Sequence, residues 1–145
     1  MANANNTIEV VQLLKIQDLA HTDTNSAYVD LAGYSGCALC VMVGALTGVD
    51  SSNYLTPILE ESDSTTETDF TTATDITASP AFSKIDSATE DEVTQWCVYT
   101  GSKRYVQVKL DYTGSSISAG YVGVFAVLTK AMREPPAAPT TGTAA

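Results

Sequence analysis

The fold is decided by two runs near the carboxy-terminal end, Tyr105-Val-Gln-Val-Lys-Leu-Asp-Tyr112 and Tyr121-Val-Gly-Val-Phe-Ala-Val-Leu128. In the first run apolar and polar residues alternate, which predicts a strand with one buried face and one wetter face. The second run is apolar on both faces, so we expect both faces to be covered, by this chain or by another subunit. Gly114–Gly120 between them has the glycines and serines of a turn. The two runs are therefore predicted to pair as a hairpin.

Outward from this pair, short apolar runs separated by turn residues predict further strands. Thr7–Ile16 fits a strand or a short helix, and its Val and Ile residues favour the strand. Pro57 lacks a backbone donor, so its strand is expected at a sheet edge or a bulge. The other predicted strands cover 26–31, 37–45, 54–62 and 93–100. This spacing is typical of an all-β fold, a single-domain β-sandwich or jelly roll.

The period-two pattern also predicts which side chains fill the core. The expected core residues are Val41, Val43, Val106, Val108, Leu110, Val122, Val124 and Val127, with Trp96 nearby. A single aromatic residue within a strand usually packs inside.

The domain is expected to span residues 7–132, with an arm at each end. Residues 1–6 form a short polar arm, and residues 133–145 are rich in Pro, Ala and Thr. The second segment is predicted to form no strand and to stay extended, because proline favours that conformation. Inside the domain, residues 60–92 are rich in acids, Ser and Thr and are expected to form exposed loops and short strands, with Phe70, Ile76, Phe82 and Ile85 as apolar anchors.

Charge limits the possible partners. A net charge of −10 at neutral pH argues against a nucleic-acid backbone and against an anionic membrane, so we expect neither as a partner. The first residues lack the charged and apolar parts of a signal peptide, and no apolar run is long enough to span a bilayer. Synthesis and folding in the cytoplasm are therefore expected.

Residues that carry chemistry are few and scattered. Cys37 and Cys40 have the spacing of half a zinc site or a redox pair, but residues three apart in a strand face opposite sides, which favours buried thiols. His21 lies in a polar loop without a nucleophile motif around it. The acids of residues 60–92 do not match a calcium loop. The sequence therefore predicts no enzyme, no metal site and no cofactor.

Two groups of residues are candidates for binding a protein partner. Lys103, Arg104 and Tyr105 stand together at the start of a predicted strand; they form either an exposed turn or an anchor for carboxylates of a partner. In the carboxy-terminal arm, the candidates are Arg133, Pro135, Pro136 and Pro139, since a proline-rich arm loses little entropy when it lies across a neighbour.

Three short stretches occur in a familiar order. Val29-Asp-Leu-Ala-Gly-Tyr34 precedes the apolar run 37–45, and Leu59-Glu-Glu-Ser-Asp-Ser64 precedes a Thr-rich segment. Tyr99-Thr-Gly-Ser-Lys-Arg-Tyr-Val-Gln-Val108 then precedes the last apolar run and the proline-containing tail. Over residues 26–136, this order resembles a family of small virion proteins of tailed bacteriophages. It is similar to capsid cement, or decoration, proteins of the jelly-roll type.

The resemblance implies a structural protein that binds the outer surface of a phage capsid and stabilises the shell. Its implied partners are the major capsid protein and further copies of itself, as a homo-dimer or homo-trimer. It implies a place on the exterior of the virion after synthesis in the cytoplasm of the bacterial host. Two other functions remain open: a head-completion or tail-associated phage protein, and a carbohydrate-binding β-sandwich in which Trp96 and tyrosines stack on sugars.

Overall fold

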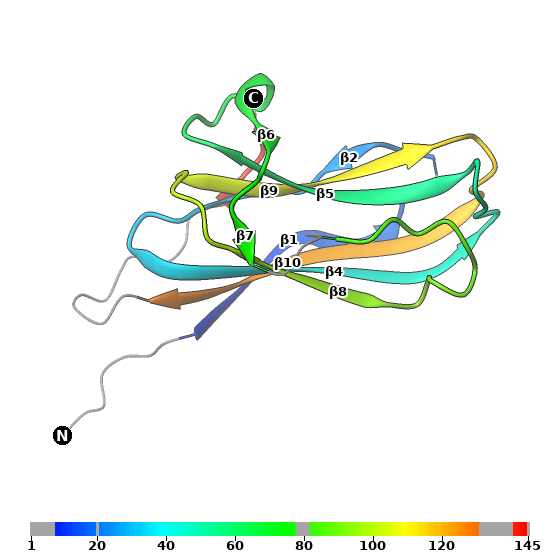
Figure 1. Cartoon of the computed structure of the whole chain (residues 1–145), viewed down its shortest axis with the longest axis horizontal. Helices are drawn as coiled ribbons and strands as arrows, with labels where there is room; N and C mark the ends of the chain where they lie inside the picture. The colour runs from blue at the N-terminus through cyan, green and yellow to red at the C-terminus, as the bar shows by residue number, and fades with distance from the viewer. Residues whose placement is uncertain (1–7, 20, 78–81, 131–140, 145) are drawn as a thin grey trace.

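A computed structural model describes residues 8–19, 21–77, 82–130 and 141–144 of the chain (Figure 1). Within these residues, eleven strands form two antiparallel sheets that pack face to face. The described part contains no α-helix, and its one short helical turn is the 3-10 turn η1 (Glu67–Asp69). The prediction of an all-β sandwich is confirmed.

The first sheet, the lower layer in Figure 1, has the strand order β1-β10-β4-β8-β7. Its strands are β1 (Ile8–Asp18), β10 (Ala119–Lys130), β4 (Tyr34–Thr47), β8 (Thr94–Tyr99) and β7 (Ile76–Thr77). The segment that fitted either a strand or a helix is therefore a strand, as its β-branched residues favoured. β10 pairs with β1 on one side and with β4 on the other.

The second sheet, the upper layer, has the order β11-β3-β9-β5-β6, and β2 also pairs with β9. Its strands are β2 (Thr24–Asn25), β3 (Tyr28–Asp30), β5 (Tyr54–Ser62), β6 (Thr71–Thr72), β9 (Tyr105–Thr113) and β11 (Thr141–Gly142). Pro57 of β5 lies opposite Leu110 of β9, whereas β6 joins the other side of β5 at Glu60 and Glu61. The far side of β5 also bridges to Ile85 at Leu55, so β5 is not an edge strand and Pro57 lies in the unpaired stretch between these two contacts.

The predicted hairpin between the last two long runs is wrong. β9 pairs with β5, β2 and β3 in the second sheet, whereas β10 pairs with β1 and β4 in the first. The segment Gly114–Ser118 carries the chain from one sheet to the other. The sheets of a sandwich lie about 10 Å apart, a gap that this short segment can cross. The turn residues were recognised correctly, but they connect two layers and not two neighbours in one sheet.

The core consists of alternate residues on the facing sides of the two sheets. Seven of the predicted core residues are buried there: Val41, Val43, Val106, Val108, Leu110, Val122 and Val124. The predictions for Val127 and Trp96 are wrong. In β10 the inward set continues through Ala126 and Leu128, so Val127 points outward, and in β8 the inward residues are Cys97 and Tyr99. Trp96 is 51% exposed.

The acidic segment 60–92 has mostly exposed or half-buried side chains in its described part, as expected. Phe70, Phe82 and Ile85 anchor it as buried residues, and Ile76 is half-buried. Phe70 stacks on Tyr28 at the outer side of the second sheet, with 6.4 Å between ring centroids.

The carboxy-terminal segment is only in part what the sequence predicted. Thr141 and Gly142 form β11 against β3, so the prediction that no strand follows Met132 is wrong. The amino-terminal arm 1–6 and residues 131–140, which include Arg133, Pro135, Pro136 and Pro139, lie outside the described residues.

Candidate functional site

The three stretches quoted above for their order meet at one end of the sandwich. The Arg104 guanidinium donates two hydrogen bonds to Asp30, from Nε to Oδ1 at 3.0 Å and from Nη2 to Oδ2 at 2.8 Å. The Lys103 ammonium lies 2.6 Å from a carboxylate oxygen of Asp63. Asp30 comes from the first stretch, Asp63 from the second, and both cations from the third. Stretches far apart in sequence therefore form one continuous site.

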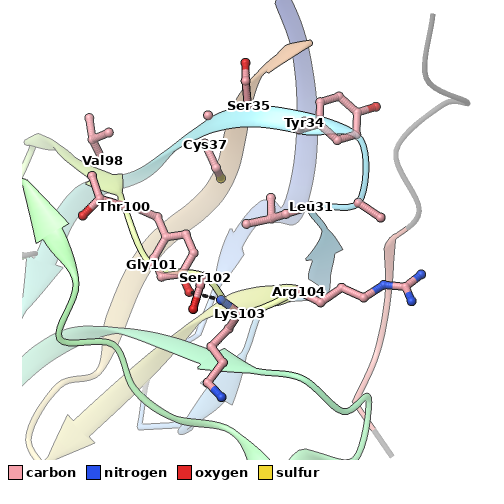
Figure 2. A pocket seen from close by; sticks show the side chains of 13 residues that line it. Leu31, Tyr34, Ser35, Cys37, Val98, Thr100, Gly101, Ser102, Lys103 and Arg104 are labelled. Carbon is pink, nitrogen blue, oxygen red and sulfur yellow. Dashed lines mark hydrogen bonds between the residues drawn. The ribbon is translucent and has the colours of Figure 1, made fainter. Parts of the chain in front are cut away.

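A cavity of about 680 Å³ lies at this end, between the β3–β4 connection and the β8–β9 connection. Figure 2 shows the Leu31 and Cys37 side chains pointing into it, while those of Lys103 and Arg104 point away. Tyr99 is buried in its wall. The Tyr99 hydroxyl donates a 2.6 Å hydrogen bond to Glu61 and accepts one of 2.9 Å from the backbone N–H of Lys103. Burial, and then the Glu61 carboxylate, raise the pKa of Tyr99.

Both cations of this end site already have partners within the chain. The hydrogen bond from Arg104 holds the pKa of Asp30 below its usual value, and the hydrogen bond from Lys103 does the same for Asp63. The guanidinium also lies over the Tyr105 ring, 5.2 Å from its centroid. Lys103, Arg104 and Tyr105 are thus held in place by their neighbours, and their contact with another protein stays a prediction.

The wall of the cavity includes one thiol, that of Cys37. Burial raises the pKa of the Cys37 thiol to about 12, so this thiol stays protonated at neutral pH. Cys40 and Cys97 are also free and buried, as predicted for small apolar side chains. Among the described residues, no group of three or more His, Cys, Asp or Glu side chains could hold a metal ion.

The outer face of the first sheet is the second notable surface. Residues in register on neighbouring antiparallel strands point to the same side of a sheet, so the pairing defines rows across β1, β10, β4 and β8. The rows are Val10–Val127–Ala38–Val98, then Gln12–Phe125–Cys40–Trp96, then Gly123–Met42–Thr94 with Ile16 lying over Gly123. These rows contain no charged side chain. We call this surface the apolar face.

Cys40 shows how side chains pack on the apolar face. It is fully buried, although it points away from the sandwich core, because its row neighbours Trp96 and Phe125 lie on either side of it. Their rings meet edge to face, with centroids 5.5 Å apart. Cys37 and Cys40 therefore lie on opposite faces of β4, as the strand prediction required.

The outer face of the second sheet has the opposite character. Lys109 and Asp111 form an ion pair of 3.3 Å on β9, and the Gln107 amide donates a 2.9 Å hydrogen bond to Glu60. The two sheets therefore differ in polarity on their outer sides. The sequence carried a signal for this difference, because β10 is apolar on both faces and β1 places Ile8 and Val10 at alternate positions. No prediction from the sequence placed β1 in such a surface.

Comparisons with known proteins do not extend this description. No family model, no curated protein and no solved structure matches the chain. The described part of the chain contains no helix long and apolar enough to cross a membrane.

Proposed function

We propose that this chain is a structural virion protein that binds the outer surface of a bacteriophage capsid shell as a cement protein. One observation carries the proposal. The three stretches on which the resemblance to phage cement proteins depends form one site, joined by the Arg104–Asp30 and Lys103–Asp63 pairs. Pairing of β3 and β5 with β9 brings the three stretches together at Tyr105, so one partner could contact the charged residues of all three.

The end site has the features of a contact surface for a large partner. It offers a recess of about 680 Å³ with an apolar wall. At its border lie the cations of Lys103 and Arg104, whose side chains are held by Asp63 and Asp30. Interfaces commonly combine an apolar centre with a polar, charged rim. In this proposal the end site contacts the major capsid protein.

The first test is the number of copies in purified particles of the phage that encodes the chain. A cement protein is present in hundreds of copies, because it repeats over the symmetric shell, whereas a head-completion or tail-associated protein is present in about a dozen or fewer. Quantitative mass spectrometry separates these outcomes. Absence from the particles would refute a virion role altogether.

The second test addresses the end site itself. Shells that lack the protein are mixed with wild type, with the double variant Lys103→Ala/Arg104→Ala, and with the control Lys109→Ala, whose ion pair lies on the outer face of the second sheet. Loss of the end-site cations is expected to weaken binding roughly tenfold or more. The control is expected to bind as wild type does. Equal binding by all three would place the contact elsewhere.

A carbohydrate-binding function is the second candidate, and one observation favours it. Trp96 is exposed beside a groove of about 540 Å³ whose polar lining includes Lys84, Glu90 and Gln95. A stacking ring next to polar side chains can hold a sugar. The chain has one Trp, so a change of its fluorescence during titration with glycans reports directly on this site. No response to any glycan, together with many copies per particle, would favour the cement function.

A further inference from the structure

We propose that the apolar face is covered by the same face of a second copy, related by a two-fold axis that runs along the strands between β10 and β4. This inference deepens the proposed function, on which it rests for the view that the chain is a subunit of an assembly. It assigns self-association to the first sheet and leaves the end site free for a different partner. It also chooses the dimer over the trimer.

The size of the apolar face suits a stable dimer. Seven large apolar side chains are more than a third exposed. Five of them belong to the rows of the apolar face or lie over it: Val10, Ile16, Met42, Trp96 and Val98. The other two, Ile8 and Tyr121, continue it beyond the rows at opposite ends of the β1–β10 pair. At ordinary side-chain areas the seven side chains expose roughly 800 Å², which is what each partner contributes to an interface of standard size. An apolar patch of this extent is unusual on a monomer.

Charge identifies the occupant as a second copy. The chain carries a net charge of −10, so most of its surface repels another copy. The three rows of the apolar face contain no charged side chain, so two copies can meet over these rows without burying a charge. Beyond them, Asp18 lies in register with Tyr121, and its carboxylate accepts a hydrogen bond from the Gly120 N–H. A basic partner would gain nothing from this face, because it offers no carboxylate along its rows.

The shape of the apolar face is complementary to itself. Trp96 stands at its β8 side, supported by Phe125. At its β1 side lies a hollow of about 410 Å³, lined in part by Val10, Gln12 and Ile16. The hollow depends on Gly123, because a Cβ atom there would lie 2.6 Å from Ile16 Cγ1.

The proposed axis brings these two features together. Rotation about a line between β10 and β4 exchanges β10 with β4 and β1 with β8, and each row stays at the same height. Trp96 and Gln12 belong to one row, so Trp96 of each copy meets the hollow around Gln12 of the other. By the same rule, Val98 of each copy faces Val10 of the other.

The test measures the mass of the free protein by sedimentation and light scattering, without capsid shells. Its result is therefore separate from that of shell binding. Wild type is expected to be a dimer. V10K and V98E each place an unpaired charge in the interface and are expected to be monomers, while W96A is expected to raise the dissociation constant roughly thirtyfold or more. The combined variant V10K/V98E places opposite charges face to face across the axis and is expected to restore the dimer.

Two controls make the outcome decisive. T56K adds a lysine to the outer face of the second sheet, opposite Asp111, and is expected to leave the dimer intact. Circular dichroism and thermal unfolding check that every variant is folded, which is expected because Val10 and Val98 are exposed in the single chain. A monomeric or trimeric wild type, a dimeric V10K or a T56K monomer would overturn the proposal. So would a V10K/V98E variant that stays monomeric, because the proposed axis places these two positions face to face.

Discussion

Tyr99 of β8 and Glu61 of β5 are joined by a 2.6 Å hydrogen bond that links the two sheets. Tyr99 belongs to the inward side of the first sheet, and Glu61 lies in register with Val106 on the inward side of the second. A tyrosine hydroxyl at this depth needs a partner, and the carboxylate supplies it. The bond also fixes the β8–β9 connection, because the same hydroxyl accepts the Lys103 N–H.

The first prediction concerns this bond. Tyr99→Phe removes the hydroxyl and leaves the Glu61 carboxylate and the Lys103 N–H without it, so the free energy of unfolding should fall by about 1–3 kcal/mol. Urea unfolding measures this loss. The matched control is Tyr34→Phe, whose hydroxyl donates to Glu9 at a less buried position and should cost less. Equal losses in the two variants would show that the hydrogen bond between the sheets contributes no more to the free energy of unfolding than the Tyr34–Glu9 bond does.

The burial of Tyr99 also shows where sequence reasoning is ambiguous. In β8, Trp96 and Val98 alternate with Cys97 and Tyr99, so both faces of the strand are apolar and the pattern cannot decide which is inward. The larger residue was expected inside. The structure turns Cys97 and Tyr99 inward instead, because Tyr99 finds a hydrogen-bond partner in the second sheet and Trp96 packs on Phe125 outside.

The second prediction uses the Asp30–Arg104 pair. Arg104 lowers the pKa of Asp30 in the folded protein, so the unfolded chain binds a proton more readily as the pH falls. The pair therefore stabilises the fold above pH 3.8, the ordinary value, and this contribution is lost as the pH falls through the lowered pKa. Asp30→Asn should be less stable than wild type at neutral pH, and the difference should shrink in acid. Unfolding curves across this range measure it, and a difference that does not change with pH would contradict the assignment.

The third prediction concerns the thiol beneath the aromatic pair. Burial raises the pKa of Cys40 from 9.0 to about 11, and Trp96 is part of its cover. Trp96→Ala should expose this thiol, and full return to the ordinary pKa would increase its thiolate fraction roughly a hundredfold. The rate of alkylation, followed residue by residue with mass spectrometry, measures the change.

The alkylation experiment needs an internal control and a monomeric background. Cys37 and Cys97 lie on the core side and should stay protected in the same sample. The measurement is best made in a V10K background, so that self-association does not cover Cys40 again. Equal acceleration at all three thiols would indicate general unfolding, and no acceleration at Cys40 would show that Trp96 does not protect it.

The wrong hairpin has a physical explanation in the same terms. Glycines and serines specify that the chain turns, but the pairing of the strands depends on which neighbours each strand finds. β9 has neighbours on both sides within the second sheet, and β10 has neighbours on both sides within the first, so neither has a free edge for the other. The sequence predicted the strands and most of their inward residues, whereas the order of strands depends on contacts between distant segments.

The last prediction tests the segment that crosses between the sheets. The Asn53 side-chain oxygen accepts hydrogen bonds from the backbone N–H groups of Ser115 and Ser116, at 2.9 and 3.0 Å. Asn53→Ala leaves both donors without this partner, so it should lower the free energy of unfolding by about 1–3 kcal/mol. Gly114→Ala should lower it at least as much, because Gly114 has a φ of +86° and a Cβ atom there would collide with Asn53 Oδ1. Asn25→Ala is the control, because its amide contacts Glu67 and not the crossing segment.

If Asn53→Ala unfolds like wild type and the amides after Gly114 keep their protection from hydrogen exchange, the crossing is held by the strands alone. If Asn53→Ala lowers the free energy of unfolding and removes the protection of these amides, while Asn25→Ala has little effect, the Asn53 side chain fixes the path of the chain from β9 to β10.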